Sequence, residues 1–150
     1  EKKFKMLAKN GYKVSIARGF SFVGKNILNY NYFISQMIKN IFLKKNIVIK
    51  NEKTFRSYMH ENDMCKWLIK IGNVSSINCP IYNVGSDQTI NITKLAKEMS
   101  IKYNVNLIVK KPKKIKYDFY VPSTSLVKRE LKLKTSINIK HAIKQLINNL

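Results

Sequence analysis

The sequence predicts an α/β protein in which short β-prone runs alternate with amphipathic helical segments. Its 150 residues are 45% hydrophobic and 11% aromatic, which is typical of one folded domain with a substantial core. The first 17 residues predict a helix, a tight glycine turn and a strand, an order typical of an α/β unit with a parallel strand. Later segments place apolar residues at helical spacing behind a polar residue that suits a helix N-cap.

The first 31 residues predict a helix, a strand and a loop. Residues 1–9 form the end of an amphipathic helix that Asn10–Gly11 terminates. Because no capping residue precedes this helix, we expect the chain to be the middle of a longer protein. Residues 12–17 form the strand, Arg18 ends it, and residues 19–31 form the loop.

The loop after the first strand is a candidate ligand site. Ligands of open α/β sheets bind beyond the carboxyl ends of the strands, so Phe20, Ser21 and Phe22 are candidates for the floor of a site. Gly24 allows a close approach of the backbone. Loop aromatics that cover the edge of a core are an equally good interpretation.

Residues 32–43 predict the next helix, because their apolar side chains repeat at helical spacing. A short strand over residues 47–49 and a turn over residues 50–53 follow. Residues 54–68 then gather rare polar side chains: one of the three arginines, one of the two histidines and one of the three aspartates. The only tryptophan of the chain also lies there.

Within this stretch, residues 56–60 predict a strand with Arg56 and His60 on one face. Asn62 or Asp63 suits the N-cap of the helix that follows. The buried face of that helix is expected to hold Met64, Trp67, Leu68 and Ile71. A strand that delivers an arginine, followed at once by a capped helix, can hold a guanidinium at a phosphate site. Spacing alone favours the simpler interpretation, in which both the arginine and the cap are structural.

The rest of the chain predicts two strands and three helices. The strands cover residues 81–84 and 105–109, and Asn91, Ser123 and Asn138 suit the N-caps of the helices. A lysine cluster after the second strand is typical of a solvated loop, although it could steer a phosphate. Its members are Lys110, Lys111, Lys113, Lys114 and Lys116.

The net charge of +21 favours an anionic ligand. Nucleic acid and anionic membranes are the usual partners of so basic a chain. However, the 29 cations include only three arginines, the side chains that read bases best. The joint abundance of lysine, asparagine and isoleucine indicates an AT-rich genome. We therefore interpret most of the charge as solvated surface and expect no nucleic-acid partner.

Several classes of function lack their sequence signals. No apolar run approaches the roughly 18 residues of a membrane span. Cys65 and Cys79 lack metal spacing, so we expect no metal site and a reducing, cytoplasmic setting. The chain has no glycine-rich dinucleotide cradle, no P-loop and no tyrosine followed four residues later by lysine. These residues alone therefore assemble no catalytic constellation.

Four blocks, in order, resemble the C-terminal half of the NAD-dependent epimerase/dehydratase family, the extended short-chain dehydrogenases/reductases that act on nucleotide sugars. The blocks are residues 13–24, 56–64, 81–86 with 92–96, and 120–133 with 139–147. The first resembles a strand ending in Arg and a Phe-Asn-x-x-Gly loop, and the second an Arg-Asp-Tyr-Ile-His-Val-x-Asp block. The third resembles a Tyr-Asn-Val-Gly strand and its helix, and the fourth a short helix ending in Glu-Leu-Gly with the final helix.

The resemblance implies a fold and a division of labour. Residues 1–150 would form the C-terminal part of a Rossmann-type fold: one central parallel strand with flanking helices, plus the small α/β substrate-binding lobe. The N-terminal half, absent from this chain, would bind NAD or NADP and supply a Tyr-x-x-x-Lys pair. This chain would bind the nucleotide diphosphate so that the sugar C4 faces the nicotinamide, in an epimerase or 4,6-dehydratase, and would be inactive by itself.

The resemblance also implies site residues. Phe20 and Ser21 would lie near the nicotinamide, with Ser21 and Phe22 on the sugar side. Arg56 would bind the diphosphate, and Asp63 would remain a structural N-cap.

Departures from the family pattern lie at other positions. Lys25 stands where proline is common, and it could face phosphate. The family has a second arginine near its final segment, and this chain has no clear counterpart of it. Lys116 supplies a positive charge in that region, but a lysine lacks the paired N–H donors with which an arginine binds two oxygens at once.

Two further expectations concern partners. A strand cut from its parallel neighbours loses its cover, so we expect the isolated chain to form a homodimer, swap elements or dissolve poorly. The alternative function is a basic module that binds nucleic acid or another polyanion without catalysis.

Overall fold

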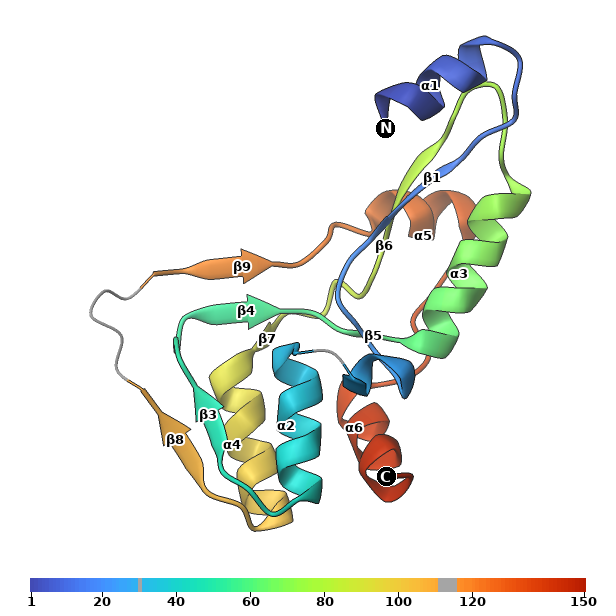
Figure 1. The fold of residues 1–150 in the computed structure, drawn as a ribbon. Helices are drawn as coiled ribbons and strands as arrows, with labels where there is room; N and C mark the ends of the chain where they lie inside the picture. The colour runs from blue at the N-terminus through green and yellow to red at the C-terminus, as the bar shows by residue number, and fades with distance from the viewer. Residues whose placement is uncertain (30, 111–115) are drawn as a thin grey trace.

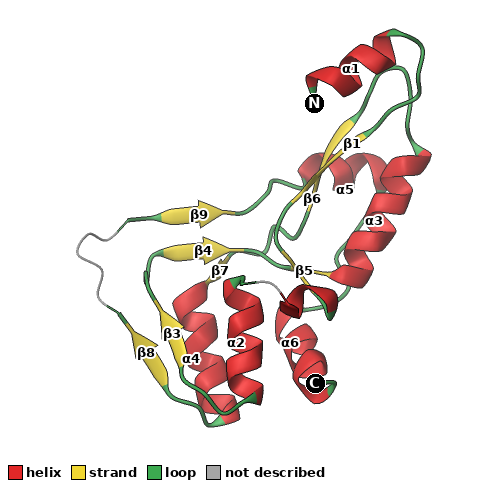
Figure 2. Cartoon of the chain, in the orientation of Figure 1, coloured by secondary structure: helices red, strands yellow, loops and turns green. Residues whose placement is uncertain are grey.

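A computed structural model describes residues 1–29, 31–110 and 116–150 as a mixed α/β structure (Figures 1 and 2). The helices are α1 (Lys2–Lys9), η1 (Asn26–Asn29, a 3₁₀-helix), α2 (Phe33–Phe42), α3 (Glu61–Asn73), α4 (Ile92–Tyr103), α5 (Ser125–Leu131) and α6 (Ile139–Asn148). The strands are β1 (Ile16–Gly19), β2 (Phe22–Val23), β3 (Ile47–Ile49), β4 (Thr54–Arg56), β5 (Met59–His60), β6 (Ile81–Val84), β7 (Ile90–Asn91), β8 (Leu107–Val109) and β9 (Asp118–Tyr120). Lys111, Lys113 and Lys114 of the lysine cluster lie outside the described residues.

The strands form small sheets with mostly parallel pairing. β1 pairs with β6, β2 with β5 and β3 with β8, all in parallel. β4 lies at the centre of a three-stranded sheet, antiparallel to β7 and parallel to β9. The predicted α/β class is confirmed, and the predicted central strand has a parallel partner in β6.

Two clusters of buried apolar side chains hold these elements together. The larger lies among α2, α4, α6 and β3 and includes Ile38, Met99 and Ile143. The smaller surrounds Trp67, where α3 and α5 flank the β1–β6 pair (Figure 1). Full burial of one such aliphatic side chain contributes about 1.5–3 kcal/mol. The β7–β4–β9 sheet packs against the larger cluster through Ile90.

The N-terminus of α3 differs from the prediction. His60 is the N-cap, and its Nδ1 accepts the N–H of Asn62 (3.1 Å). Asp63 lies inside the helix, so the N-cap predicted for it, or for Asn62, is wrong. The buried Asp63 carboxylate instead accepts the N–H and hydroxyl of Ser136 (2.7 and 2.6 Å) and the N–H of Ile137 (3.1 Å). It therefore ties α3 to the segment before α6, a structural role of another kind.

Three strand and loop boundaries also differ. The first strand covers Ile16–Gly19 rather than residues 12–17, because its pairing with β6 includes Arg18. The predicted loop over residues 19–31 contains β2 and η1. The predicted strand over residues 56–60 is two strands in separate sheets, so its residues do not share one alternating face.

The remaining caps give a mixed result. Asn91 and Asn138 cap α4 and α6 through their side chains, as predicted. The N-cap of α5 is Thr124 rather than Ser123, and it makes no side-chain capping bond. Leu68, predicted to be buried, is 41% exposed. No helix in the described ranges is long and apolar enough to cross a membrane.

Candidate functional site

The turn between β1 and β2 forms the floor of a first hollow. The Phe20 N–H donates to Val84 O (2.9 Å) and the Met59 N–H donates to Ser21 O (3.1 Å), so the turn is fixed to β6 and β5. Gly85 permits this packing, since a Cβ there would lie 3.0 Å from Cβ of Phe20. The first hollow has a volume of about 230 Å³ and is lined by Gly19, Phe20, Ser21, Phe22, Ile27, Tyr32, Tyr58 and Tyr120.

A second hollow lies against one face of the β7–β4–β9 sheet. We call this the inner face; it consists of Thr54, Arg56, Ile90, Asp118 and Tyr120, because paired and alternate residues share a face. The second hollow has a volume of about 380 Å³ and is lined by Asn31, Phe33, Gln36, Val48, Ile49, Lys50, Asn51, Thr54, Arg56, Tyr58, Ile92 and Asp118. Tyr58 lines both hollows, which therefore adjoin.

Arg56 supplies the guanidinium of the second hollow, and Asp118 holds it. Nη1 of Arg56 donates to Oδ1 of Asp118 (3.0 Å), and Nη2 donates to Oδ2 (2.5 Å). The hydrogen bond from Arg56 holds the pKa of Asp118 below its usual range. Both groups are therefore charged at neutral pH, and their charges cancel. The Arg56 and Asp118 side chains keep 24% and 47% of their surface exposed.

The guanidinium is also fixed by backbone and aromatic groups. Nη1 donates to the carbonyls of Phe55 (2.9 Å) and Asp118 (3.2 Å). Among the described residues, no acceptor contacts Nε or the second hydrogen of Nη2, and we call this side of the guanidinium its open edge. The Tyr120 ring lies 6.0 Å from Cζ of Arg56 and 4.9 Å from the Phe20 ring. Tyr120 therefore links the floor of the first hollow to the guanidinium of the second.

Tyr58 stands between the hollows as a neutral phenol. Burial raises the pKa of Tyr58 to about 12, against the opposing effect of the Arg56 charge. Its phenolate is therefore scarce at neutral pH. Neither hollow is lined by a described histidine or cysteine, and the described ranges hold no cluster of metal-ligating side chains. The described walls can bind an anion and a flat or hydroxylated group.

The structure brings together four of the predicted site residues. Phe20, Ser21 and Phe22 line the first hollow. Arg56 lines the adjoining second hollow. This neighbourhood was predicted from the resemblance and not from the spacing of Arg56, which favoured a structural role.

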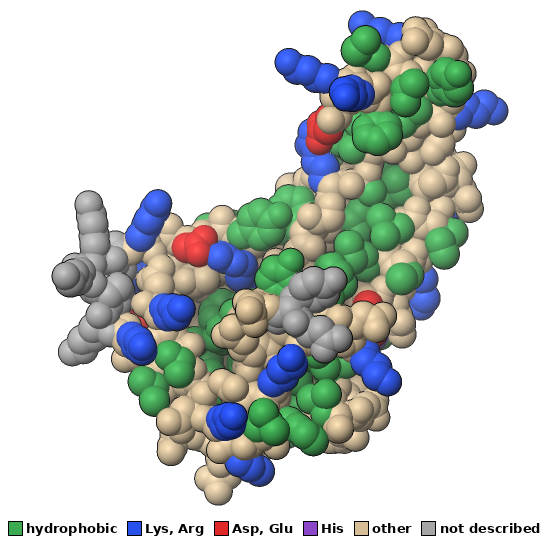
Figure 3. Space-filling view, in the orientation of Figure 1, with side chains coloured by type: hydrophobic (Ala, Val, Ile, Leu, Met, Phe, Trp, Pro, Cys, Tyr) green, Lys and Arg blue, Asp and Glu red, His purple; other side chains and the backbone are tan. Residues whose placement is uncertain are grey.

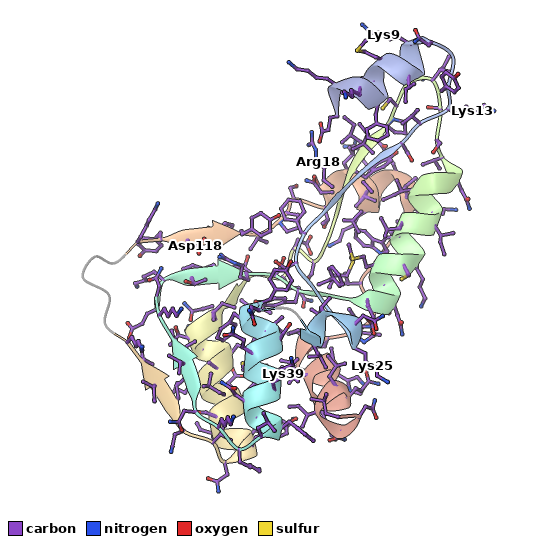
Figure 4. All side chains as sticks on the ribbon, viewed as in Figure 1. Lys9, Lys13, Arg18, Lys25, Lys39 and Asp118 are labelled. Atoms are coloured by element: carbon purple, nitrogen blue, oxygen red, sulfur yellow. The ribbon has the colours of Figure 1, made fainter. Side chains whose placement is uncertain are left out.

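The two predicted lysines lie outside both hollows. The backbone N–H of Lys25 donates to the Glu61 carboxylate (3.1 Å) at a third hollow, beside His60. Figure 4 shows Lys25 well away from Asp118. The carbonyl of Lys116 accepts a hydrogen bond from Asn51 (2.7 Å), and the Lys116 charge helps to lower the pKa of Asp118. Lys116 therefore lies close to the second hollow without lining it.

Two inner-face residues were not predicted as part of the site. Asp118 is one of three aspartates in the chain, and this rarity was the one available signal. Tyr120 is one of eight tyrosines, and β9 was not predicted at all. Only the parallel pairing of β9 with β4 places both beside Arg56.

Proteins of known structure share the fold of this chain. The sequence matches no protein-family model and no curated protein. The structure does match solved structures, among them an epimerase from Methanothermobacter thermautotrophicus with a TM-score of 0.79 at 13% identity. That match covers 97% of this chain and 45% of the epimerase chain.

Two more structures agree with the first. An NAD-dependent NDP-hexosamine 5,6-dehydratase of tunicamycin biosynthesis has a TM-score of 0.77 at 16% identity, covering 96% of this chain and 49% of its own. A UDP-glucose 4-epimerase from Thermotoga maritima, solved with UDP-glucose, has a TM-score of 0.75 at 13% identity, covering 91% and 45%.

The chain has the fold of the C-terminal part of an extended short-chain dehydrogenase/reductase. It spans less than half the length of the three solved structures. The first hollow lies at the end of β1, and the second lies against the inner face of the β7–β4–β9 sheet.

Proposed function

We propose that this chain is the substrate-binding part of an NAD(P)-dependent nucleotide-sugar epimerase or 4,6-dehydratase. The observation that carries the proposal is the pair of adjoining hollows around Tyr58, with Ser21 in one and the Arg56 guanidinium in the other. The matched solved structures include a UDP-glucose 4-epimerase solved with UDP-glucose and an NDP-hexosamine 5,6-dehydratase. The cytoplasmic location and the single unit over residues 1–150 belong to the same proposal.

The chemistry of the walls suggests how a nucleotide sugar would lie. The open edge of Arg56 offers two N–H donors to a diphosphate oxygen. The second hollow combines the Phe33 ring with the side-chain amides of Gln36 and Asn51, which suits the nucleoside. The sugar would then enter the first hollow, where the Ser21 hydroxyl lies among aromatic walls.

The nicotinamide cofactor fits only in part. The first hollow, with Phe20 and Ser21 at its floor, suits the edge of a flat ring. The chain has no glycine-rich cradle for a dinucleotide pyrophosphate, so NAD or NADP would be held mainly by the N-terminal half that the fold implies. When bound, the cofactor supplies hydride transfer at the sugar C4, and the residues of this chain orient the sugar towards it.

An Arg56→Ala variant tests the proposal. Nucleoside diphosphates and their sugars would be titrated calorimetrically into the full-length protein. Loss of a charge-assisted hydrogen bond costs about 1.5–3 kcal/mol, so affinity should fall at least tenfold. Lys53→Ala is the matched control, because Lys53 precedes β4 and its side chain lies on the opposite face. An equal loss in both variants would show a general field effect and contradict the proposed anchor.

The second candidate function is polyanion binding on the outer face of the same sheet. This outer face consists of Lys53, Phe55, Asn91, Tyr117 and Phe119. Tyr117 and Phe119 are 70% and 63% exposed, and Nζ of Lys53 lies 5.5 Å from the Tyr117 ring centre. The rings of Phe55 and Tyr117 are nearly parallel, at 4° and 6.3 Å. Exposed rings beside lysine are the means by which proteins bind single-stranded nucleic acid.

Fluorescence anisotropy with a single-stranded oligonucleotide separates the two candidates. Outer-face binding requires a steep salt dependence and a loss on Tyr117→Ala, with Arg56→Ala as the control. Blue side chains are scattered over the surface visible in Figure 3, and the outer face holds a single lysine, Lys53, among its five residues. We therefore place this candidate second.

Self-association also belongs to the proposal. Phe4, Met6 and Leu7 of α1 are exposed, as are residues 17–19 of β1. Parallel strands are normally covered on both faces, so a second copy or the remaining half of the enzyme would cover this region. Light scattering of the isolated chain should show a dimer or larger species, and a monodisperse monomer would contradict this expectation.

A further inference from the structure

Arg56, the proposed diphosphate anchor, is paired with a carboxylate that phosphate binding alone does not require. A carboxylate of the same chain already occupies one edge of the Arg56 guanidinium, with bonds of 3.0 and 2.5 Å to Asp118. An incoming phosphate therefore meets a neutral pair rather than a free cation. It also meets repulsion from a carboxylate that is hydrogen-bonded to Nη2, the nitrogen that the phosphate itself would approach.

Positioning of the guanidinium does not depend on this carboxylate alone. The carbonyls of Phe55 and Asp118 both accept from Nη1 of Arg56. The register of β4 with β9 fixes the backbone on both sides, with Arg56 opposite Tyr120 and Thr54 opposite Asp118. The carboxylate group therefore adds mainly a negative charge at this place.

The surroundings supply the positive charge that such a counter-ion opposes. Lys50 lines the second hollow, and Lys116 lies close enough to lower the pKa of Asp118. In a chain of net charge +21, an unpaired arginine near these lysines would attract any phosphate in solution. A nearby carboxylate offsets that general attraction and leaves the other walls of the hollow unchanged.

Resting on the proposed function, we propose that Asp118 is a built-in counter-ion that keeps free phosphate and pyrophosphate off Arg56. A diphosphate binds at Arg56 only when its nucleoside also contacts Phe33, Gln36 and Asn51 in the second hollow. Asp118 thereby makes the site selective for a nucleoside diphosphate over an inorganic one.

The test uses Asp118→Asn, which removes the charge but keeps an acceptor for Nη1 of Arg56. The probes are UDP, dTDP and GDP, inorganic pyrophosphate, and the neutral nucleosides, titrated into the full-length protein. Pyrophosphate affinity should rise tenfold or more, the affinity for the nucleoside diphosphate that binds should rise about fivefold, and nucleoside affinity should stay within twofold. Glu52→Gln is the matched control, because it makes the same charge change outside the second hollow and should change every affinity by less than twofold.

Two variants keep the outcome decisive. In Arg56→Ala/Asp118→Asn the gain should vanish; a gain that persists means that Arg56 is not the group that Asp118 shields. If thermal unfolding shows that Asp118→Asn is not folded, Asp118→Ser takes its place.

The proposed function and this inference fail in different ways. If nucleotides bind, Arg56→Ala weakens them, and Asp118→Asn gives no gain or a loss, then Asp118 positions Arg56 and only the inference is overturned. If no nucleoside diphosphate binds to the natural protein or to Asp118→Asn, both are overturned.

Discussion

The two faces of the β7–β4–β9 sheet are built from neighbouring residues and have opposite chemistry. On the inner face, the charged Arg56 and Asp118 pair with each other beside a hollow. On the outer face, the rings of Tyr117 and Phe119 stand exposed beside Lys53. Strand alternation alone separates them, since successive side chains point to opposite faces. The difference is that the charges of the inner face are paired and fixed beside a hollow, whereas the lysine of the outer face lies beside exposed rings.

The largest effect is expected from a change that touches neither face. Asp63→Ala removes three hydrogen bonds, which the N–H and hydroxyl of Ser136 and the N–H of Ile137 donate to the buried carboxylate. A hydrogen bond to a charged group contributes about 1.5–3 kcal/mol, so the free energy of unfolding should fall by about 3 kcal/mol in urea denaturation. Because neither face contains Asp63, the variant shows how much a general loss of stability lowers ligand affinity. A loss below about 1 kcal/mol would contradict the structural role of Asp63.

The same carboxylate predicts a dependence of stability on pH. Although burial acts to raise it, the hydrogen bonds from Ser136 and Ile137 hold the pKa of Asp63 below its usual range. A lowered pKa in the folded state gives stability that is present above the unfolded value of about 3.9 and is lost as pH falls through the folded value. Urea unfolding of the natural protein between pH 6 and pH 3 should show this loss, and Asp63→Asn should flatten it.

The next effect compares adjacent aromatic residues on the two faces. Tyr120→Ala removes the ring that contacts both Phe20 and Arg56, with pair energies of about 0.5–1.5 kcal/mol for the ring pair and 0.5–1 kcal/mol for the cation. Nucleotide-sugar affinity should therefore fall about fivefold or more in calorimetry. Phe119→Ala removes an outer ring of similar size and should leave that affinity within twofold. Equal losses would mean that the faces do not differ in ligand binding.

The smallest effect concerns the contribution of the exposed Arg56–Asp118 pair to stability. The hydrogen bond from Arg56 lowers the pKa of Asp118, so this contribution is present above about pH 4 and is lost on further acidification. An exposed pair contributes less than about 1 kcal/mol after screening. Chemical denaturation of Arg56→Ala at pH 6 and pH 3 should differ from the natural protein by no more than this. A larger difference would make the pair structural rather than a part of the ligand site.

The sequence predicted elements well where one local signal decided them. Helical spacing located α2 and α6, and Asn91 and Asn138 are the caps they were predicted to be. The prediction of the α3 N-cap failed because tertiary partners determine that region. Asp63 accepts hydrogen bonds from residues more than 70 positions away, and His60 is the N-cap instead. The chain breaks between β4 and β5 because the two strands pair in different sheets. The alternation of side chains along the sequence does not reveal such a break.

The site was predictable only in part for the same reason. Phe20, Ser21 and Phe22 follow a strand, and that rule placed them at a hollow. Arg56 was predicted from the family resemblance, whereas its partner Asp118 lies 62 residues away on a strand that was not predicted. Lys25 was assigned by its place in a motif, and its loop turns instead towards Glu61.

The central claim is that the inner face, and not the outer face, meets a nucleotide. A titration of the ¹⁵N-labelled protein with the nucleoside diphosphate that binds tests it most directly, by following both faces at once. We predict that the Nε–H signal of Arg56 and the amides of Tyr58 and Tyr120 shift in a saturable manner, while the amides of Tyr117 and Lys53 stay in place. Saturable shifts confined to Tyr117 and Lys53, with Arg56 unchanged, would contradict the account.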